Sequence, residues 1–138
     1  MSDEDLVQHA DDAFEAIRAL NHGTYRTLPA PLVYELLGNL NNVGYGLAQL
    51  LGQMSAGLTR SLAEYDVYDH NRDPGASVAL AHDAMRTAAQ HAHELGTLLA
   101  AAQTAINSQG YNGRRHDPQD QQNEPGGGNE DHDGDGVR

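Results

Sequence analysis

Histidines are the residues of this chain best suited to metal binding or proton transfer, and there are eight of them. A helical pair of zinc ligands is usually spaced by three or four residues, as in the H-E-x-x-H motif, which this sequence lacks. His82 and His93 share a helix face but are too far apart along it for such a pair. His9 has suitable spacing to Asp5 and to Asp12, but the simpler interpretation is that these are exposed side chains near the start of a helix. The sequence therefore predicts no metal site and no cofactor.

Motifs for other chemistry are incomplete. Ser and His are scattered without a nucleophile elbow, and the chain has no Cys to act as a nucleophile or thiolate ligand. Residues 131–136 have the oxygen-rich composition of a calcium loop, but the twelfth-position Glu and the flanking helices are missing. We therefore expect no enzymatic activity and assign no catalytic residue.

The charge balance limits the partners to expect. All eight basic residues are Arg, and twenty Asp and Glu residues bring the formal net charge to -12. Direct nucleic-acid binding needs clustered positive charge and is not expected. The acidic first residues do not resemble a secretory signal, and no apolar run reaches the length of a membrane-spanning helix. We expect a cytoplasmic protein without membrane contact.

Three segments carry apolar residues at helical spacing and predict an all-α fold. The first covers residues 3–21, with Ser2 as its N-cap. The second covers residues 31–65, and the third covers residues 74–108 after the cap residue Asp73. Residues 1–110 are thus expected to form one helical domain. Residues 111–138, rich in Gly, Asn, Gln and Asp, are expected to form a disordered acidic tail.

The second and third segments repeat their apolar positions in alternate steps of four and three, as coiled-coil heptads do. Each helix would be about 50 Å long, and the loop between them is short and polar. This predicts a long antiparallel two-helix hairpin, with a Leu-rich strip facing an Ala-rich one. Five glycines interrupt residues 31–65, and a kink, if present, is expected at 41–46. The Leu-rich strip consists of Val33, Leu37, Leu40, Gly44, Leu47, Leu51, Met54, Leu58, Ser61 and Tyr65.

A second apolar stripe on residues 31–65 contains Leu36, Val43 and Leu50. We expect the shorter N-terminal helix to pack on that half of the hairpin. The other half then has two helices only, and its uncovered apolar residues predict a homodimer or a partner-protein contact. The inter-helix loop adds tyrosines and an arginine, which are common at binding hot spots. The predicted partner-binding residues are Met54, Leu58, Leu62, Tyr65, Tyr68, Arg72, Val78 and Met85.

Two families bear comparison with these segments. The WXG100 secretion family has hairpins of similar size, but its turn carries a Trp, which this chain lacks. Residues Arg18–Thr24 and Val33–Gly38 and the close of the third segment resemble uncharacterised small helical proteins of Streptomyces-type actinobacteria. That resemblance covers about residues 14–111. It implies a helical fold and a bacterial origin, and no activity.

The sequence thus favours a non-enzymatic helical interaction or oligomerisation protein. This interpretation rests on the heptad repeats of the second and third segments and on the missing catalytic motifs. Two alternatives remain open: an acidic decoy of a basic nucleic-acid-binding surface, and a helical hairpin exported without a cleaved signal.

Overall fold

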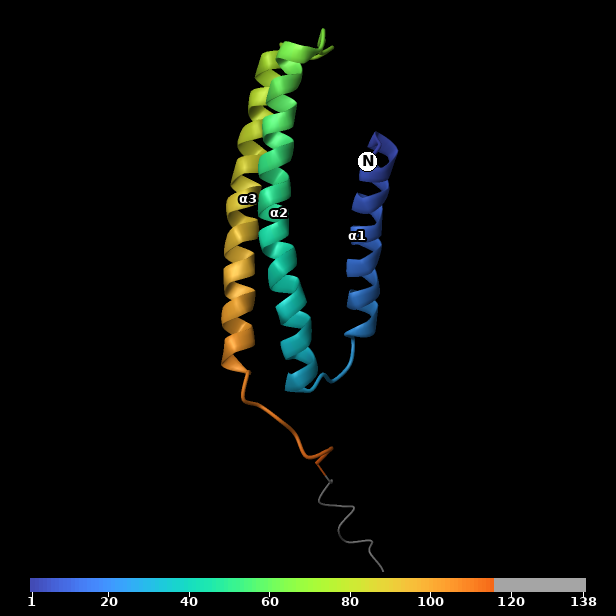
Figure 1. Cartoon of the computed structure of the whole chain (residues 1–138), viewed down its shortest axis with the longest axis vertical. Coiled ribbons are helices and arrows are strands. Elements are labelled where there is room, and N and C mark those ends of the chain that lie inside the picture. The colour runs from blue at the N-terminus through green and yellow to red at the C-terminus, as the bar shows by residue number, and fades with distance from the viewer. Residues whose placement is uncertain (116–138) are drawn as a thin grey trace, which may run out of the picture.

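The computed structural model describes residues 1–115, which contain three α-helices and no strand (Figure 1). Helix α1 spans Asp3–Gly23, α2 spans Ala30–Glu64 and α3 spans Pro74–Ala105. The predicted all-α fold is confirmed for this part of the chain. The predictions made for residues 116–138, including the acidic repeat at 131–136, lie outside the described residues.

Local hydrogen bonds fix where α1 and α3 begin. The Asp5 N–H donates to Ser2 Oγ at 3.2 Å, and the Ser2 N–H donates to Asp5 Oδ2 at 2.9 Å, forming a capping box. These bonds lower the pKa of the Asp5 carboxyl. At α3, the Ala76 N–H donates to Asp73 Oδ2 at 3.2 Å, and Pro74 occupies the first turn.

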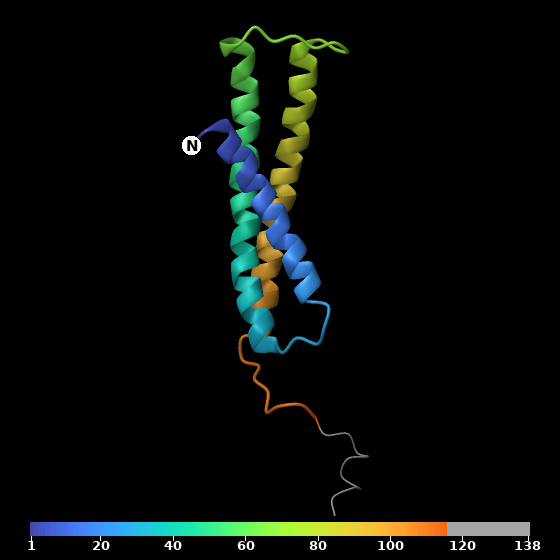
Figure 2. The ribbon, with the colours of Figure 1, turned by 90° about the vertical axis from the view of Figure 1, so that its right-hand side faces the viewer.

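Helices α2 and α3 pack against each other along their length and run in opposite directions (Figures 1 and 2). Their backbones lie close together at Gly44 and Gly96. A Cβ atom placed on Gly44 would lie 2.7 Å from the Gly96 backbone nitrogen, so neither position has room for a side chain. Helix α2 passes through this point without a break. The glycines at the contact therefore serve close helix approach.

We call the residues that are buried between α2 and α3 the contact row. They are smaller than the heptads predict. Ser55 is 3% exposed and Ala92 8% exposed, whereas Leu47 and Met54 remain 40% and 51% exposed. A straight helix has 3.6 residues per turn, so a heptad strip rotates by about 20° per repeat relative to the partner. Leu47 and Met54 consequently turn out of the contact, and Ser55 turns into it.

The expected packing of the N-terminal helix on α2 is not present. Within residues 1–115, no Cα atom of α1 lies within 8 Å of one in α2 or α3, and α1 has no buried residue. Figure 2 shows α1 crossing in front of the α2–α3 pair. Its last turn approaches the start of α2 through alanines: an open apolar hollow between them is lined by Ala16, Ala19, Leu20, Gly23, Thr24, Arg26, Leu28, Leu32 and Leu36. The linker thus turns the side of α1 that carries small residues toward α2. The larger apolar side chains of α1, which were expected to cover α2, stay in solvent.

Matched glycine substitutions test the close contact of α2 with α3. Gly44→Ala should lower the free energy of unfolding by about 1 to 3 kcal/mol, because the new Cβ meets backbone that must shift. Gly46→Ala should instead raise it by about 0.5 to 1 kcal/mol, since nothing lies within 4 Å of that Cβ and Ala favours the helix. Chemical denaturation followed by circular dichroism measures both. Equal stability of the two variants would contradict the contact.

Candidate functional site

The most prominent surface feature of the α2–α3 pair is a row of half-exposed apolar side chains along α2. Val43, Leu47, Leu50 and Met54 are 46%, 40%, 47% and 51% exposed. Steps of four, three and four place them on one side of the helix. We call these four residues the α2 apolar face. These side chains form a connected apolar row that remains in contact with solvent.

The α2 apolar face lies in a stretch of helix that carries no charge. No Asp, Glu, Arg or His occurs between Glu35 and Arg60, although most of these residues touch solvent. An exposed helix face is normally covered by charged side chains, as α1 is. The composition of α2 is therefore that of a helix covered on more sides than α3 alone covers.

Helix α1 carries a second exposed apolar row. Leu6, Val7, Phe14 and Ile17 are 56%, 71%, 64% and 42% exposed. We call these four residues the α1 stripe. Helical periodicity places Asp12 and Glu15 on the other side of the helix, whereas Asp11 borders Val7 and Phe14 at steps of four and three. The periodicity of the stripe was visible in the sequence, but it was interpreted as a surface buried against α2.

The residues predicted to bind a partner do not form one cluster. Met54 belongs to the α2 apolar face. Leu58 and Met85 are half-buried between α2 and α3, and Val78 is buried at 8% exposure. The others gather at the loop end of the helix pair and are exposed, namely Leu62, Tyr65, Tyr68 and Arg72. The structure thus separates a loop end rich in tyrosine from the apolar face of α2.

Asp69 holds the shape of the loop between α2 and α3. Its Oδ1 accepts hydrogen bonds from the backbone N–H groups of Asn71 at 2.9 Å and Arg72 at 3.1 Å. The Asn71 bond is the main cause of the lowered pKa of the Asp69 carboxyl. The Tyr68 and His70 rings meet edge to face, with centroids 5.1 Å apart. This turn fixes the backbone from which Tyr68 and Arg72 project.

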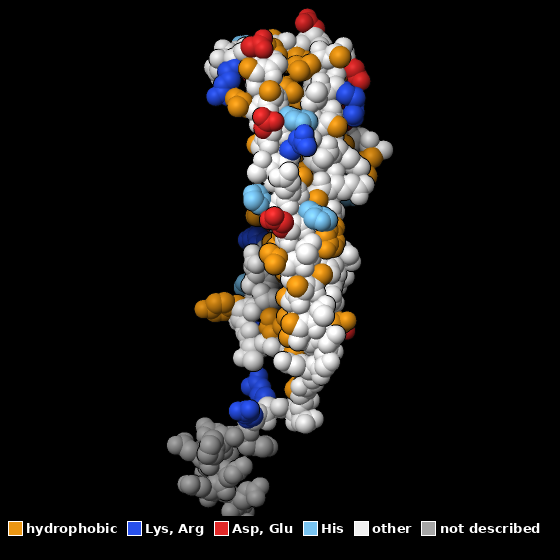
Figure 3. All heavy atoms as spheres, turned by 90° about the vertical axis from the view of Figure 1, so that its left-hand side faces the viewer, with side chains coloured by type: hydrophobic (Ala, Val, Ile, Leu, Met, Phe, Trp, Pro, Cys, Tyr) orange, Lys and Arg blue, Asp and Glu red, His pale blue; other side chains and the backbone are white. Residues whose placement is uncertain are grey.

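The side of the helix pair turned away from α1 carries histidine side chains. Figure 3 shows histidine, arginine and acidic side chains over this side. His82 Nδ1 lies 3.2 Å from Thr59 Oγ1, and the His93 ring lies 5.1 Å from the Tyr45 ring, so both histidines contact α2. No group of three His, Asp or Glu side chains suited to a metal ion occurs in residues 1–115. These contacts hold the two helices together beside a hollow whose lining includes Ser55, His82 and His93.

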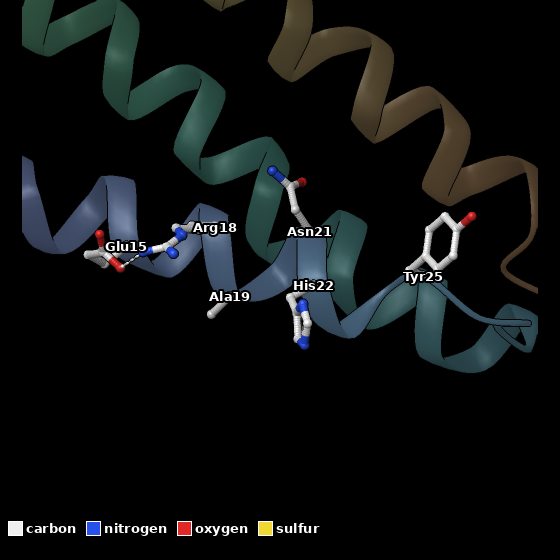
Figure 4. Close-up of a pocket in the computed structure, with 6 residues that line it drawn as sticks. All are labelled: Glu15, Arg18, Ala19, Asn21, His22 and Tyr25. Carbon is white, nitrogen blue, oxygen red and sulfur yellow. Dashed lines mark hydrogen bonds and ion pairs between the residues drawn. The ribbon is translucent and has the colours of Figure 1, made fainter.

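A hollow beside the end of α1 also lacks the arrangement of a ligand site. Its lining includes Glu15, Arg18, Asn21, His22 and Tyr25, all drawn in Figure 4. Glu15 and Arg18 form an exposed ion pair at 3.4 Å. The other three side chains point in different directions, and Tyr25 is 96% exposed. No set of polar groups converges there on a common point.

Comparison of the chain with models of known protein families, with curated proteins and with solved structures finds no match. No helix in residues 1–115 is long and apolar enough to cross a membrane.

The Asp69 turn makes a pH-dependent prediction. Hydrogen bonds to the carboxylate lower its pKa, so they strengthen the turn above the usual aspartate value of about 3.9 and are lost as pH falls through the lowered value. The amide proton shifts of Asn71 and Arg72, followed by NMR, should therefore titrate with a midpoint below that usual value. In Asp69→Ala these titrations should disappear. A midpoint at or above the usual value would contradict the role given to Asp69.

Proposed function

We propose that this protein is a non-enzymatic helical interaction protein that associates with a second copy of itself through the α2 apolar face. The observation that carries the proposal is the half-exposed row from Val43 to Met54 within a charge-free part of α2. Apolar surface of this kind gains roughly 25 cal/mol for each Å² removed from water. Association therefore supplies the burial that α3 alone does not give.

The packing inside the α2–α3 pair supports the need for further burial. Among residues 1–115, Val78 and Ala92 are the only hydrophobic residues that are buried, and no large side chain is fully buried. Two helices in contact leave most of each surface in water. Helical surface from a second copy would bury the α2 apolar face much as a helix bundle buries its core.

The loop end of the α2–α3 pair is the second part of this proposal. Tyr65 and Tyr68 are 70% and 77% exposed, and Arg72 lies on the same ordered turn. Residues of these types often anchor interfaces. We assign them to the rim of the contact, with the α2 apolar face at its centre.

Paired charge substitutions test the proposal. The double variant Val43→Glu with Leu50→Glu should raise the dissociation constant of self-association by roughly 100-fold, because both carboxylates would be buried without partners. Both sites are half-exposed, so the α2–α3 pair should still fold. Leu58 and Met85 are less informative sites, since they also contribute to packing between the helices. Sedimentation velocity gives the association state, and circular dichroism gives the helix content.

The matched control places the same two charges elsewhere on α2. Gln49→Glu with Gln53→Glu alters exposed residues outside the α2 apolar face and should leave self-association nearly unchanged. The proposal fails if the unaltered protein sediments as a monomer at micromolar concentration. It also fails if the Val43 and Leu50 double variant stays folded and associates as before.

A further inference from the structure

We infer that two copies associate by exchange of α1: the α1 stripe of each copy packs on the α2 apolar face of the other. This inference rests on the proposed function and names the element that covers the face. It starts from two exposed apolar surfaces on one chain, neither of which covers the other.

The two surfaces match in length. Helix α1 has 21 residues, about 31 Å at 1.5 Å per residue. The apolar side of α2 from Leu36 to Met54 is about 27 Å long by the same rise. One helix laid along the other therefore covers the whole row, and no second element is needed.

The two surfaces also match in chemistry. The α2 apolar face carries no charge, so the acidic α1 meets no like charge on it. Helical periodicity keeps Asp5, Asp12 and Glu15 on the side away from the stripe and so in water, while Asp3 and Asp11 lie at its edge. The contact would bury apolar groups and leave most of the ionised ones exposed.

The exposed area is sufficient for a stable dimer. Together the α1 stripe and the α2 apolar face expose on the order of 800 Å², which equals one partner's share of a standard-size interface. A two-fold contact requires that one chain carry both complementary surfaces, as this chain does. An unrelated helix bound to α2 would leave the α1 stripe in water, whereas a second copy covers both at once.

The position of α1 favours exchange over closure within one chain. Its alanine side, at Ala16 and Ala19, faces the start of α2 across the apolar hollow, while Val7 and Phe14 remain 71% and 64% exposed. The linker begins with a fixed turn, in which the Thr24 N–H donates to the Leu20 carbonyl at 2.9 Å. Turning the stripe toward its own α2 would require rotation of α1 about its axis. A second copy can meet the stripe where it already points.

Single cysteines in this cysteine-free chain test the exchange. Ala10→Cys lies on the stripe side of α1, and Val43→Cys lies on the α2 apolar face. Ala10 lies near the middle of the α1 stripe, and Val43 lies near the middle of the apolar side of α2 from Leu36 to Met54, so their proximity depends little on the direction in which α1 lies. The two variants, one of them labelled with ¹⁵N, are unfolded and refolded together and then treated with a short bis-maleimide. Mass spectrometry identifies which chains are joined.

The expected product is a cross-linked pair with one labelled and one unlabelled chain. Asp12→Cys, on the opposite side of α1, is the matched control and should give about tenfold less product with Val43→Cys, because its effective concentration at the face is lower. The double variant Ala10→Cys with Val43→Cys, diluted before treatment, should show little cross-linking within one chain.

Three other results would each overturn the inference, and they differ in what they say of the proposed function. If the unaltered protein sediments as a monomer, both the exchange of α1 and the proposed self-association are wrong. If the protein sediments as a dimer but the Ala10 to Val43 cross-link between chains does not form, the exchange is wrong and self-association is still supported. Efficient cross-linking within one diluted chain shows that α1 closes on its own α2, which also removes the exchange.

Discussion

Where α2 meets α3, the missing side chains of Gly44 and Gly96 allow one backbone to lie against the other. This close approach determines what the neighbouring positions can hold. Ser55 and Ala92 fit into the narrow contact row, while larger side chains must point to either side of it. The price of the arrangement is a small core, because glycine, serine and alanine bury little apolar area. The stability of the pair therefore depends on what covers its sides.

The two sides of the α2–α3 pair are stabilised by different interactions. On the polar side, side chains bridge the helices directly, with 3.2 Å between the hydroxyls of Tyr45 and Thr97 and a second bridge from His82 to Thr59. Net contributions of such bonds are about 1 kcal/mol each. On the other side, Val43 and Leu50 of α2 are about half-exposed. One side is thus bridged by side chains of the chain itself, whereas apolar area on the other side remains in water.

The helices could be predicted from the sequence because apolar periodicity, Ser2 and Asp73 act over a few residues. The exposure of the α1 stripe could not be predicted in this way. It depends on the direction that the linker gives to α1, and periodicity reports which residues share a side but not what that side faces. The prediction that Met54, and not Ser55, lies between the helices is wrong for a related reason. A small error in the assumed helical period accumulates along a long helix. Two signals in the sequence pointed to the α2 apolar face: the second apolar stripe at Leu36, Val43 and Leu50, and the charge-free run from Leu36 to Thr59.

Charge and apolar area act in opposite directions on contact between two copies. The net charge of -12 favours separation, because like-charged chains repel over about one Debye length. The carboxylates of α1 lie mainly on the side away from its stripe, so this repulsion acts between surfaces that stay in water and is screened by salt. The apolar contact is short-ranged and is not screened. Self-association that depends on Phe14 and Leu50 is therefore strengthened by salt, whereas an association built on ion pairs would be weakened by it.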